Sequence, residues 1–272
     1  MLGGFGTQIP PANSGAAGNR LLAALSPEDY GLLAPHLFEM TLDPDKVLQE
    51  PGQPIQRIYF PTNGIISLSA VSTAGSGIYT AIIGREGALG LTAGIGSRSA
   101  IGRAVVHAPL RTISIAQPRF AEAAAQSQAI REMIARYSDL LMAQVLQTVL
   151  CSTFHRLQSR VCRWLLHARD AAPTDVIVLT QQYLSAMLGA RRTSINMVIG
   201  ELQNDGVVEV RRGRVMIRDV DQLKRKSCPC YAAVRDLINS GPDSGVSLQP
   251  AGPNDDGLSA AKAFAMAHST GD

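Results

Sequence analysis

The stretch of sequence that decides the fold is LTQQYLSAMLGARRTSI, residues 179–195. Within it, Thr180 can cap a helix that begins at Gln181, and Gly189 permits a tight turn. A second helix is expected from Arg191 to about Asn204. Two helices at this spacing predict a helix-turn-helix, the motif whose second helix enters the major groove of DNA.

Polar side chains crowd the start of that second helix and point away from its apolar side. Arginine can bind the O6 and N7 atoms of guanine together, and threonine, serine and asparagine offer hydrogen bonds to bases or phosphates. The free backbone N–H groups at a helix start also attract phosphate. With the start of the first helix included, the residues predicted to contact DNA are Thr180, Gln181, Arg191, Arg192, Thr193, Ser194 and Asn196. The alternative is a solvated helix start in a purely structural three-helix domain.

A basic hairpin follows and argues against that alternative. Strand-like runs at 207–210 and 215–218 flank three arginines, Arg211, Arg212 and Arg214, at a predicted hairpin tip. Residues 151–226 hold thirteen basic and seven acidic residues, whereas residues 1–150 hold ten of each. A basic surplus confined to one stretch indicates a polyanionic partner. We therefore predict that the three arginines contact DNA phosphates.

Upstream, residues 21–126 predict a small antiparallel β-roll. Short runs rich in Val, Ile, Tyr and Thr alternate with Gly and Pro turn signals, which is typical of such a roll or barrel. The strand-like runs are 47–48, 57–60, 64–71, 77–83, 104–106 and 111–115. Before them, Asn19 and Ser26 can each start a short helix.

Residues 118–150 switch to helical periodicity, and within and just beyond them 127–153 is predicted as one long helix. Apolar residues recur at steps of three and four over about three heptads. This stripe packs either on the roll of its own chain or on the same helix of a second subunit. We favour the second interpretation, because a single long helix has more apolar face than one small roll can cover. The predicted dimer contacts are Ile130, Ile134, Tyr137, Leu141 and Val145.

These signals together predict an α+β chain with an N-terminal antiparallel β-roll, a long dimerisation helix and a C-terminal winged helix-turn-helix. The predicted boundaries are a disordered tail at 1–20, a sensor domain at 21–126, the dimerisation helix at 127–153, a DNA-binding domain at 154–226, and a Cys-x-Cys segment with a disordered tail at 227–272.

The same residues resemble a known family. The stretch 179–195, the turn Asp205–Gly206 and the Arg-Gly-Arg hairpin look like the winged helix of Crp/Fnr bacterial transcription regulators. Pro51–Gly52 and Gly84 fall where that family's cyclic-nucleotide-binding roll places its turns. The resemblance spans about residues 21–226, in the family's domain order. It implies a homodimer that binds a palindromic operator and acts on RNA polymerase.

The resemblance also points to a candidate effector site, with one departure from the family pattern. Nucleotide-responsive members hold the ribose with the Glu of a Gly-Glu-Leu stretch and the cyclic phosphate with an Arg-Ser pair. Here Ala88 replaces that Glu, and alanine cannot accept a hydrogen bond. Cyclic-nucleotide control is therefore not expected, and another small effector or a purely structural roll are the open alternatives. The candidate effector residues are Gly87, Ala88, Leu89, Arg98, Ser99 and, in another register, Arg103.

The recognition helix departs from the family too. The member that reads TGTGA half-sites has Arg, Glu and Arg where this chain has Arg192, Thr193 and Met197. Thr193 cannot accept from cytosine N4 as a carboxylate does, and Met197 offers only apolar contact. We expect a different operator.

The cysteines indicate a reducing compartment. Four cysteines in 272 residues are too few for a disulfide scaffold, so the cytoplasm is predicted. Cys151 and Cys162 are expected to be ordinary buried residues. The Cys228-Pro229-Cys230 pair could bind a soft metal, cycle as a disulfide, or do neither. The five histidines show no ligand spacing, and residues 1–150 lack cysteine, so neither a metal site nor the family's N-terminal iron–sulfur cluster is predicted.

Other functional classes find little support. No apolar run approaches the roughly 20 residues of a membrane span. No Walker loop, G-x-S-x-G elbow or H-E-x-x-H motif occurs, so we predict no enzyme. The predicted function is sequence-specific DNA binding in transcription regulation. The alternative is a nucleotide-binding signalling subunit whose helical domain docks protein; the basic recognition helix and hairpin argue against it.

Overall fold

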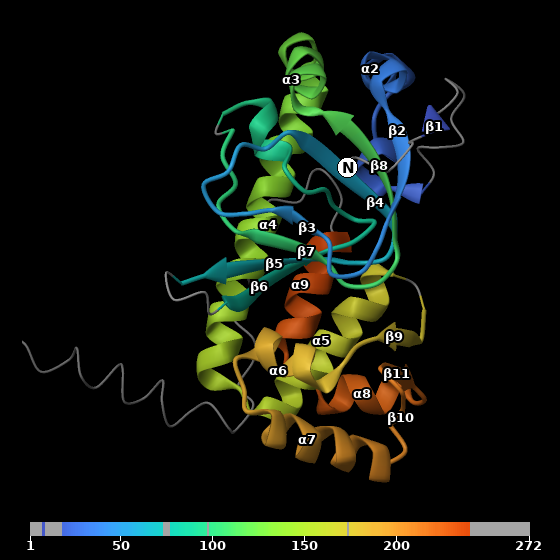
Figure 1. Ribbon diagram of the computed structural model, residues 1–272, viewed down its shortest axis with the longest axis vertical. Coiled ribbons are helices and arrows are strands. Elements are labelled where there is room, and N and C mark those ends of the chain that lie inside the picture. The colour runs from blue at the N-terminus through green and yellow to red at the C-terminus, as the bar shows by residue number, and fades with distance from the viewer. Residues whose placement is uncertain (1–6, 9–17, 73–76, 97, 173, 240–272) are drawn as a thin grey trace, which may run out of the picture.

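Two antiparallel sheets form the first half of the chain (Figure 1). The computed structural model describes residues 7–8, 18–72, 77–96, 98–172 and 174–239. One sheet has the strand order β1-β2-β8-β4 and the other β3-β7-β5-β6. Their strands are β1 (Thr7–Gln8), β2 (Phe38–Leu42), β3 (Val47–Gln49), β4 (Arg57–Asn63), β5 (Ile66–Val71), β6 (Gly77–Ile83), β7 (Arg103–Val106) and β8 (Leu110–Ala116). The predicted α+β class with an N-terminal antiparallel roll is confirmed.

The roll has a core because its strands alternate inward and outward side chains. Ile58 and Phe60 of β4 are fully buried, as are Ala104 and Val106 of β7. Side chains of the two sheets meet between them in one apolar cluster, which includes Leu42, Ile66, Leu68, Ile83 and Leu110. The sheets therefore pack face to face.

Two short helices, α1 (Arg20–Ala23) and α2 (Pro27–Leu33), precede the roll, and 3₁₀ turns occupy Ala34–His36 and Leu91–Gly94. As predicted, Asn19 and Ser26 cap the two helices. The fully buried Asn19 also donates from Nδ2 to the carbonyls of Pro61 and Gly87, at 2.9 Å each.

This anchoring corrects the predicted N-terminal tail. Asn19 is fixed to the roll, and Thr7–Gln8 pairs with Glu39–Phe38 of β2, so the segment 1–20 is not wholly irregular. The rest of that predicted tail, 1–6 and 9–17, lies outside the described residues. So does 240–272 of the predicted C-terminal tail.

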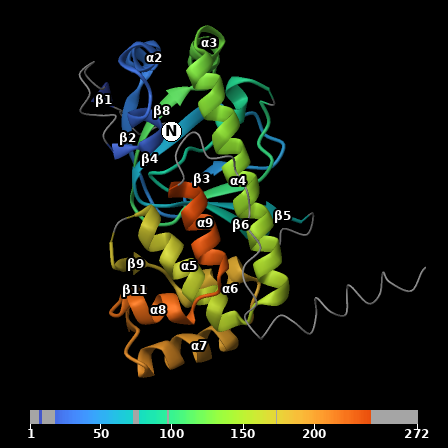
Figure 2. The same ribbon diagram turned by 180° about the vertical axis from the view of Figure 1, so that it is seen from behind.

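The long helix α4 (Gln128–Phe154) follows α3 (Gln117–Gln126) and runs beside the roll toward the other end of the molecule (Figure 2). Its 27 residues span about 40 Å. In its first half, Ile130, Ile134 and Tyr137 are at most 4% exposed and pack in the roll core with Phe120. These three predicted dimer contacts are wrong, because their own roll already covers them.

The second half of α4 presents a different face. Leu141 and Val145 are half-buried, and their predicted dimer role is still a prediction. The exposed apolar side chains form a neighbouring stripe, which we call the α4 stripe: Met142, Leu146, Val149, Leu150 and Phe154. Each is between 40% and 59% exposed. Apolar side chains repeating at steps of three and four on an uncovered face suit a second helix.

The second half of the chain builds the predicted winged helix-turn-helix. Its elements are α5 (Leu157–Ala171), β9 (Val176–Val178), α6 (Gln181–Leu188), α7 (Arg192–Asn204), β10 (Val208–Arg211), β11 (Arg214–Ile217), α8 (Val220–Lys226) and α9 (Cys230–Asn239). The three strands pair in the order β10-β11-β9. Within the described part of the chain, no helix is both long and apolar enough to span a bilayer.

The winged domain is docked on the roll through β6, against which α5 and α6 pack. Trp164 of α5 is 2% exposed and lies in one cluster with Ile65, Tyr79 and Ile82 of the roll. Close packing is also visible at Gly84, where an added Cβ would lie only 2.4 Å from the Cβ of Ala171. The two halves therefore share a continuous core.

An edge-to-face contact between two rings completes this junction. The imidazole of His107 lies edge-on to the ring of Tyr183, with 3.9 Å between ring centroids. The Tyr183 hydroxyl donates to Ser67 Oγ at 3.2 Å. His107 Nε2 is buried and has no hydrogen-bond partner among the described residues. Burial lowers the pKa of His107 from 6.5 to about 3.

This histidine should make stability depend on pH. His107 takes up a proton near pH 6.5 in the unfolded chain but only near pH 3 in the folded chain. The stability that the neutral side chain contributes is therefore fully present above pH 6.5 and is lost as the pH falls from 6.5 toward 3. At pH 5 the free energy of unfolding should be lower by about 2 kcal/mol on this account. Urea titrations at pH 7.5 and pH 5 measure it. His107→Phe keeps a ring at this position but cannot take up a proton, so its free energy of unfolding should fall less between pH 7.5 and pH 5. An equal fall in both proteins would show that His107 is not the source of the pH dependence.

Candidate nucleic-acid interface

The turn between α6 and α7 is fixed by local hydrogen bonds. Thr180 Oγ1 accepts from the backbone N–H of Tyr183 at 3.1 Å, which confirms it as the α6 cap. Gly189 takes the left-handed conformation at φ 59°, which an L side chain adopts only with strain. The Ser185 hydroxyl donates to the carbonyl of Ala190 at 2.6 Å and so closes the turn. The two helices are thus held at one angle.

The start of α7 is exposed and its far side is buried. Ile195, Val198, Ile199 and Leu202 face the domain core. On the other side, Arg191, Arg192, Thr193 and Asn196 are exposed, Ser194 is half-buried, and Met197 is 67% exposed. Arg191 stands at the cap position without a side-chain hydrogen bond, so the first N–H groups of α7 have no side-chain cap. In Figure 1, α7 lies at the end of the molecule farthest from α2 and α3.

At the start of α6, Thr180 is exposed and Gln181 is half-buried. Thr180 Oγ1 is occupied by its capping bond, but a threonine hydroxyl can still donate to a phosphate. Both residues flank α7 in the motif, and their contact with DNA is still a prediction.

The wing carries its arginines at the tip, as the sequence predicted. Gly213 has φ 75° and makes the turn, across which Arg211 pairs with Arg214. Arg211, Arg212 and Arg214 are all exposed. Arg211 is ion-paired with Glu209, which also holds Arg218, and hydrogen bonds from Arg218 and Arg211 lower the pKa of that carboxyl. Within the described residues, no ion pair engages Arg212 or Arg214, so these two are available to a phosphate.

The candidate effector residues fall into two environments. Gly87, Ala88 and Leu89 are buried under the roll and α4; an added Cβ at Gly87 would lie 2.0 Å from the Tyr137 hydroxyl oxygen. Arg98 and Ser99, by contrast, are exposed. Arg103 forms an exposed ion pair with Glu50 at 2.9 Å. A cavity of about 350 Å³ lies elsewhere, between roll and winged domain, lined among others by Arg20, Arg85, Glu86, Arg169 and Arg235. None of the six candidates lines that cavity, and their effector role is still a prediction.

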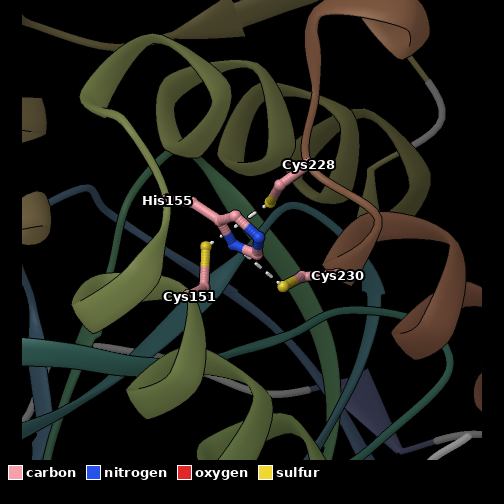
Figure 3. A group of neighbouring side chains, drawn as sticks. All are labelled: Cys151, His155, Cys228 and Cys230. Carbon is pink, nitrogen blue, oxygen red and sulfur yellow. Dashed lines mark hydrogen bonds between the residues drawn. The ribbon is translucent and has the colours of Figure 1, made fainter. Parts of the chain in front are cut away.

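Sequence reasoning missed a cluster of sulfur and nitrogen ligands. Cys151 and His155, at the end of α4, lie against Cys228 and Cys230, which flank the start of α9 (Figure 3). His155 is therefore not isolated, although the histidines showed no ligand spacing in the sequence. The Cys-x₃-His spacing at a helix end and the Cys-x-Cys pair were the available signals, but they are 77 residues apart. Cys162 is buried elsewhere, in the core of the winged domain.

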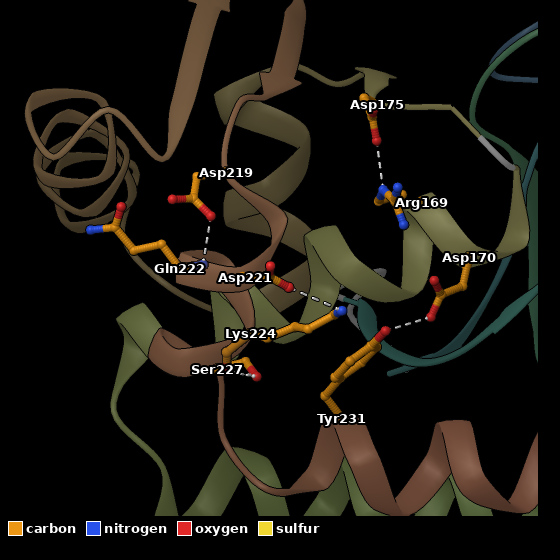
Figure 4. A network of polar contacts seen from close by, with 9 residues as sticks. All are labelled: Arg169, Asp170, Asp175, Asp219, Asp221, Gln222, Lys224, Ser227 and Tyr231. Carbon is orange, nitrogen blue, oxygen red and sulfur yellow. Dashed lines mark hydrogen bonds and ion pairs between the residues drawn. The ribbon is translucent and has the colours of Figure 1, made fainter.

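The segment after the wing is folded and fixed, which sequence reasoning also missed. Asp219 Oδ1 caps α8 by accepting from the N–H of Gln222 at 2.8 Å (Figure 4). The Tyr231 hydroxyl of α9 donates to Asp170 Oδ2 of α5 at 2.9 Å. Helix α9 also contacts α4. It therefore ties the long helix to the winged domain.

Comparisons with known proteins agree with this geometry. Residues 159–226 match the model of the Crp-like helix-turn-helix domain. The global nitrogen regulator of Synechocystis sp. is 25% identical over 227 residues, 76% of this chain and 96% of that protein. The global nitrogen regulator of Nostoc sp. is 23% identical over 199 residues, 68% and 87% of the two chains.

Solved structures show the same fold. FixK2 from Bradyrhizobium japonicum superposes with a TM-score of 0.61 at 13% identity, over 71% of this chain and 98% of that one. A CRP/FNR-family transcriptional regulator from Thermus thermophilus gives a TM-score of 0.56 at 21% identity, over 70% and 97%. These findings do not favour the alternative of a signalling subunit that docks protein. This chain therefore carries a Crp-like helix-turn-helix domain at residues 159–226, and its fold is that of Crp/Fnr-type transcription regulators, to which it is similar.

Proposed function

We propose that the protein is a cytoplasmic homodimer that reads a palindromic operator and acts on RNA polymerase. The observation that carries this proposal is the exposed polar start of α7, with Arg192 and Thr193 beside an uncapped helix N-terminus. Backbone N–H groups and arginine suit a phosphate-lined groove, and Met197 can contact a thymine methyl group. In the dimer, two copies of α7 would lie in successive major grooves, one DNA turn apart.

The dimer would form through the α4 stripe. Met142, Leu146 and Val149 are exposed on one face of α4, beyond the part that the roll covers. A two-fold interface would bring the same face of each helix together and remove both from water. The half-buried Leu141 and Val145 would lie at its edge.

The roll would serve as a sensor or a former sensor. Ala88 is 2% exposed and offers no side-chain acceptor, so we propose that cyclic AMP is not the effector. Arg98 and Ser99 are exposed and could bind another anion. Such a ligand would switch the protein only if it bound two states of the chain with different affinity.

The proposal predicts separate roles for α7 and the wing. Removing a base contact costs about 1–3 kcal/mol and relaxes preference at one base pair. Arg192→Ala should therefore flatten discrimination at one position per half-site and leave non-specific binding nearly unchanged. Arg212→Ala should weaken operator and scrambled DNA alike, and reduce the slope of log affinity against log salt by about one unit.

The measurement begins with selection of bound DNA from a random pool. Both variants are then titrated against the selected operator and a scrambled duplex across a salt series. Arg218→Ala is a matched control, because Arg218 is exposed in the same sheet region but paired with Glu209. If Arg212→Ala changed base preference while Arg192→Ala lowered both affinities equally, the roles of groove and wing would be reversed. Failure of every duplex to bind would reject DNA recognition itself.

A further inference from the structure

Four side chains from two distant segments converge at the end of α4. One Sγ, of Cys151, and Nδ1 of His155 come from the last turn of α4 and the residue after it. The other two sulfurs belong to Cys228, before α9, and Cys230, its first residue. All four ligand atoms lie within 4.8 Å of one another, and Figure 3 shows the side chains pointing toward a common centre.

The spacing fits a single tetrahedral ion. Zinc binds sulfur at about 2.3 Å and nitrogen at about 2.0 Å, so neighbouring ligand atoms of a tetrahedral site lie about 3.5–3.8 Å apart. Cys151 Sγ lies 3.5 Å from Cys228 Sγ, and Cys230 Sγ lies 3.4 Å from His155 Nδ1. The sulfur–sulfur distance is much longer than the roughly 2.05 Å of a disulfide, and all four cysteines are free. A four-iron cluster would hold the thiolates farther apart, since each binds a different iron atom.

The surroundings carry the charge that such a site needs. The side chain of Arg163 is 5% exposed. Its guanidinium donates to Thr148 Oγ1 at 2.8 Å and contacts Cys151, and within the part of the chain that the structure describes it forms no ion pair with a carboxylate. Three thiolates and one divalent ion have a net charge of −1, which the guanidinium of Arg163 offsets. The buried side chain of Gln147 forms a hydrogen bond with the Cys230 thiol.

We propose that Cys151, His155, Cys228 and Cys230 bind one Zn²⁺ ion. Mixed thiolate and imidazole ligands suit this borderline-soft ion, and a closed set of four protein ligands is the pattern of a structural site. Three of the ligands are buried, and the half-buried His155 lies on the open side, through which the ion can enter. The ion fastens the segment after the wing to the end of α4. This assignment replaces the sequence-based prediction of no metal.

Metal analysis of the full-length protein tests the site directly. Protein expressed with zinc in the medium and purified without chelator should contain one zinc ion per chain by mass spectrometry. Cys228→Ala should lose it. Cys162→Ala is the matched control: it removes an equally buried thiol from the core of the winged domain and should keep the full equivalent. Zinc retained in Cys228→Ala, or absent from the wild type, would overturn the proposal.

A second measurement does not depend on the folding of a variant. Cobalt exchanged into the wild-type protein should show thiolate-to-cobalt charge-transfer bands and the strong visible bands of tetrahedral coordination. Cobalt bound without thiolate bands would overturn the proposal. So would iron together with acid-labile sulfide, because this indicates a cluster. A disulfide between Cys151 and Cys228 would also overturn the proposal. It would be seen if the wild-type protein is purified without metal and two of its thiols react only after reduction.

Discussion

Leu146→Asp should convert the protein to a monomer and strongly weaken operator binding. Leu146 is 55% exposed in the middle of the α4 stripe, so its replacement leaves the core of the single chain intact. In a two-fold dimer the change places two carboxylates in one apolar contact, at a cost of several kcal/mol for each unpaired charge. A monomer contacts one half-site only, so affinity for the palindrome should fall by more than about 100-fold, by the loss of simultaneous binding.

Sedimentation velocity and gel shift on the selected operator measure the two effects. Leu146→Met retains an apolar side chain of similar volume and should stay dimeric. Circular dichroism should show the same helix content in both variants. If Leu146→Asp sediments as a dimer, the α4 stripe is not the interface.

Trp164→Ala should uncouple the winged domain from the roll. Trp164 is the one tryptophan of the chain, and it is 2% exposed where the two halves share a core. Truncating a buried aromatic side chain to alanine costs about 3–5 kcal/mol, because transfer energy is lost and a cavity remains. The substitution removes the packing of the Trp164 ring, on α5, against Tyr79 and Tyr183. We expect thermal unfolding to split into two transitions, with the winged domain melting first.

Phe120→Ala provides the matched comparison. Phe120 is fully buried too, but it packs within the roll and the first half of α4, with its ring 6.1 Å from that of Phe60. It should destabilise the roll by a similar amount and, because the junction with the winged domain is intact, lower the midpoint of a single cooperative transition. Calorimetry distinguishes the two cases. A single cooperative transition in Trp164→Ala, at an unchanged midpoint, would show that the shared core does not couple the halves.

The recognition elements could be predicted because their signals are local. A capping Thr180, the turn at Gly189 and the tip at Gly213 each determine the backbone within a few residues. The pairing of Arg211 with Glu209 is also local, since the two lie two positions apart on one strand, but a count of basic residues does not show which arginines are ion-paired.

The long helix shows where local signals end. A period of 3.6 residues reveals that α4 has an apolar face, yet it does not say what covers each part of that face. Ile130 and Ile134 belong to the roll, whereas Leu146 and Val149 are open. The Cys and His ligands were missed for a related reason: each pair looked unremarkable alone, and only the folded chain brings residue 151 to residue 228. Strand β2 (Phe38–Leu42) was missed, although the turn signal Asp43–Pro44–Asp45 follows it directly.

The meeting of Cys151 and Cys228 has one more consequence. The chain leaves α4, builds the whole winged domain and returns to the end of α4, where the sulfur atoms of Cys151 and Cys228 lie 3.5 Å apart although the two residues are 77 positions apart. A unit whose entry and exit coincide can be inserted into another protein, or removed from one, without stretching the host. The DNA-reading part of this molecule is therefore one continuous segment, and the same roll could be given a new target sequence by exchanging that segment, provided that the new one keeps the side chains of α5 and α6 that pack on β6.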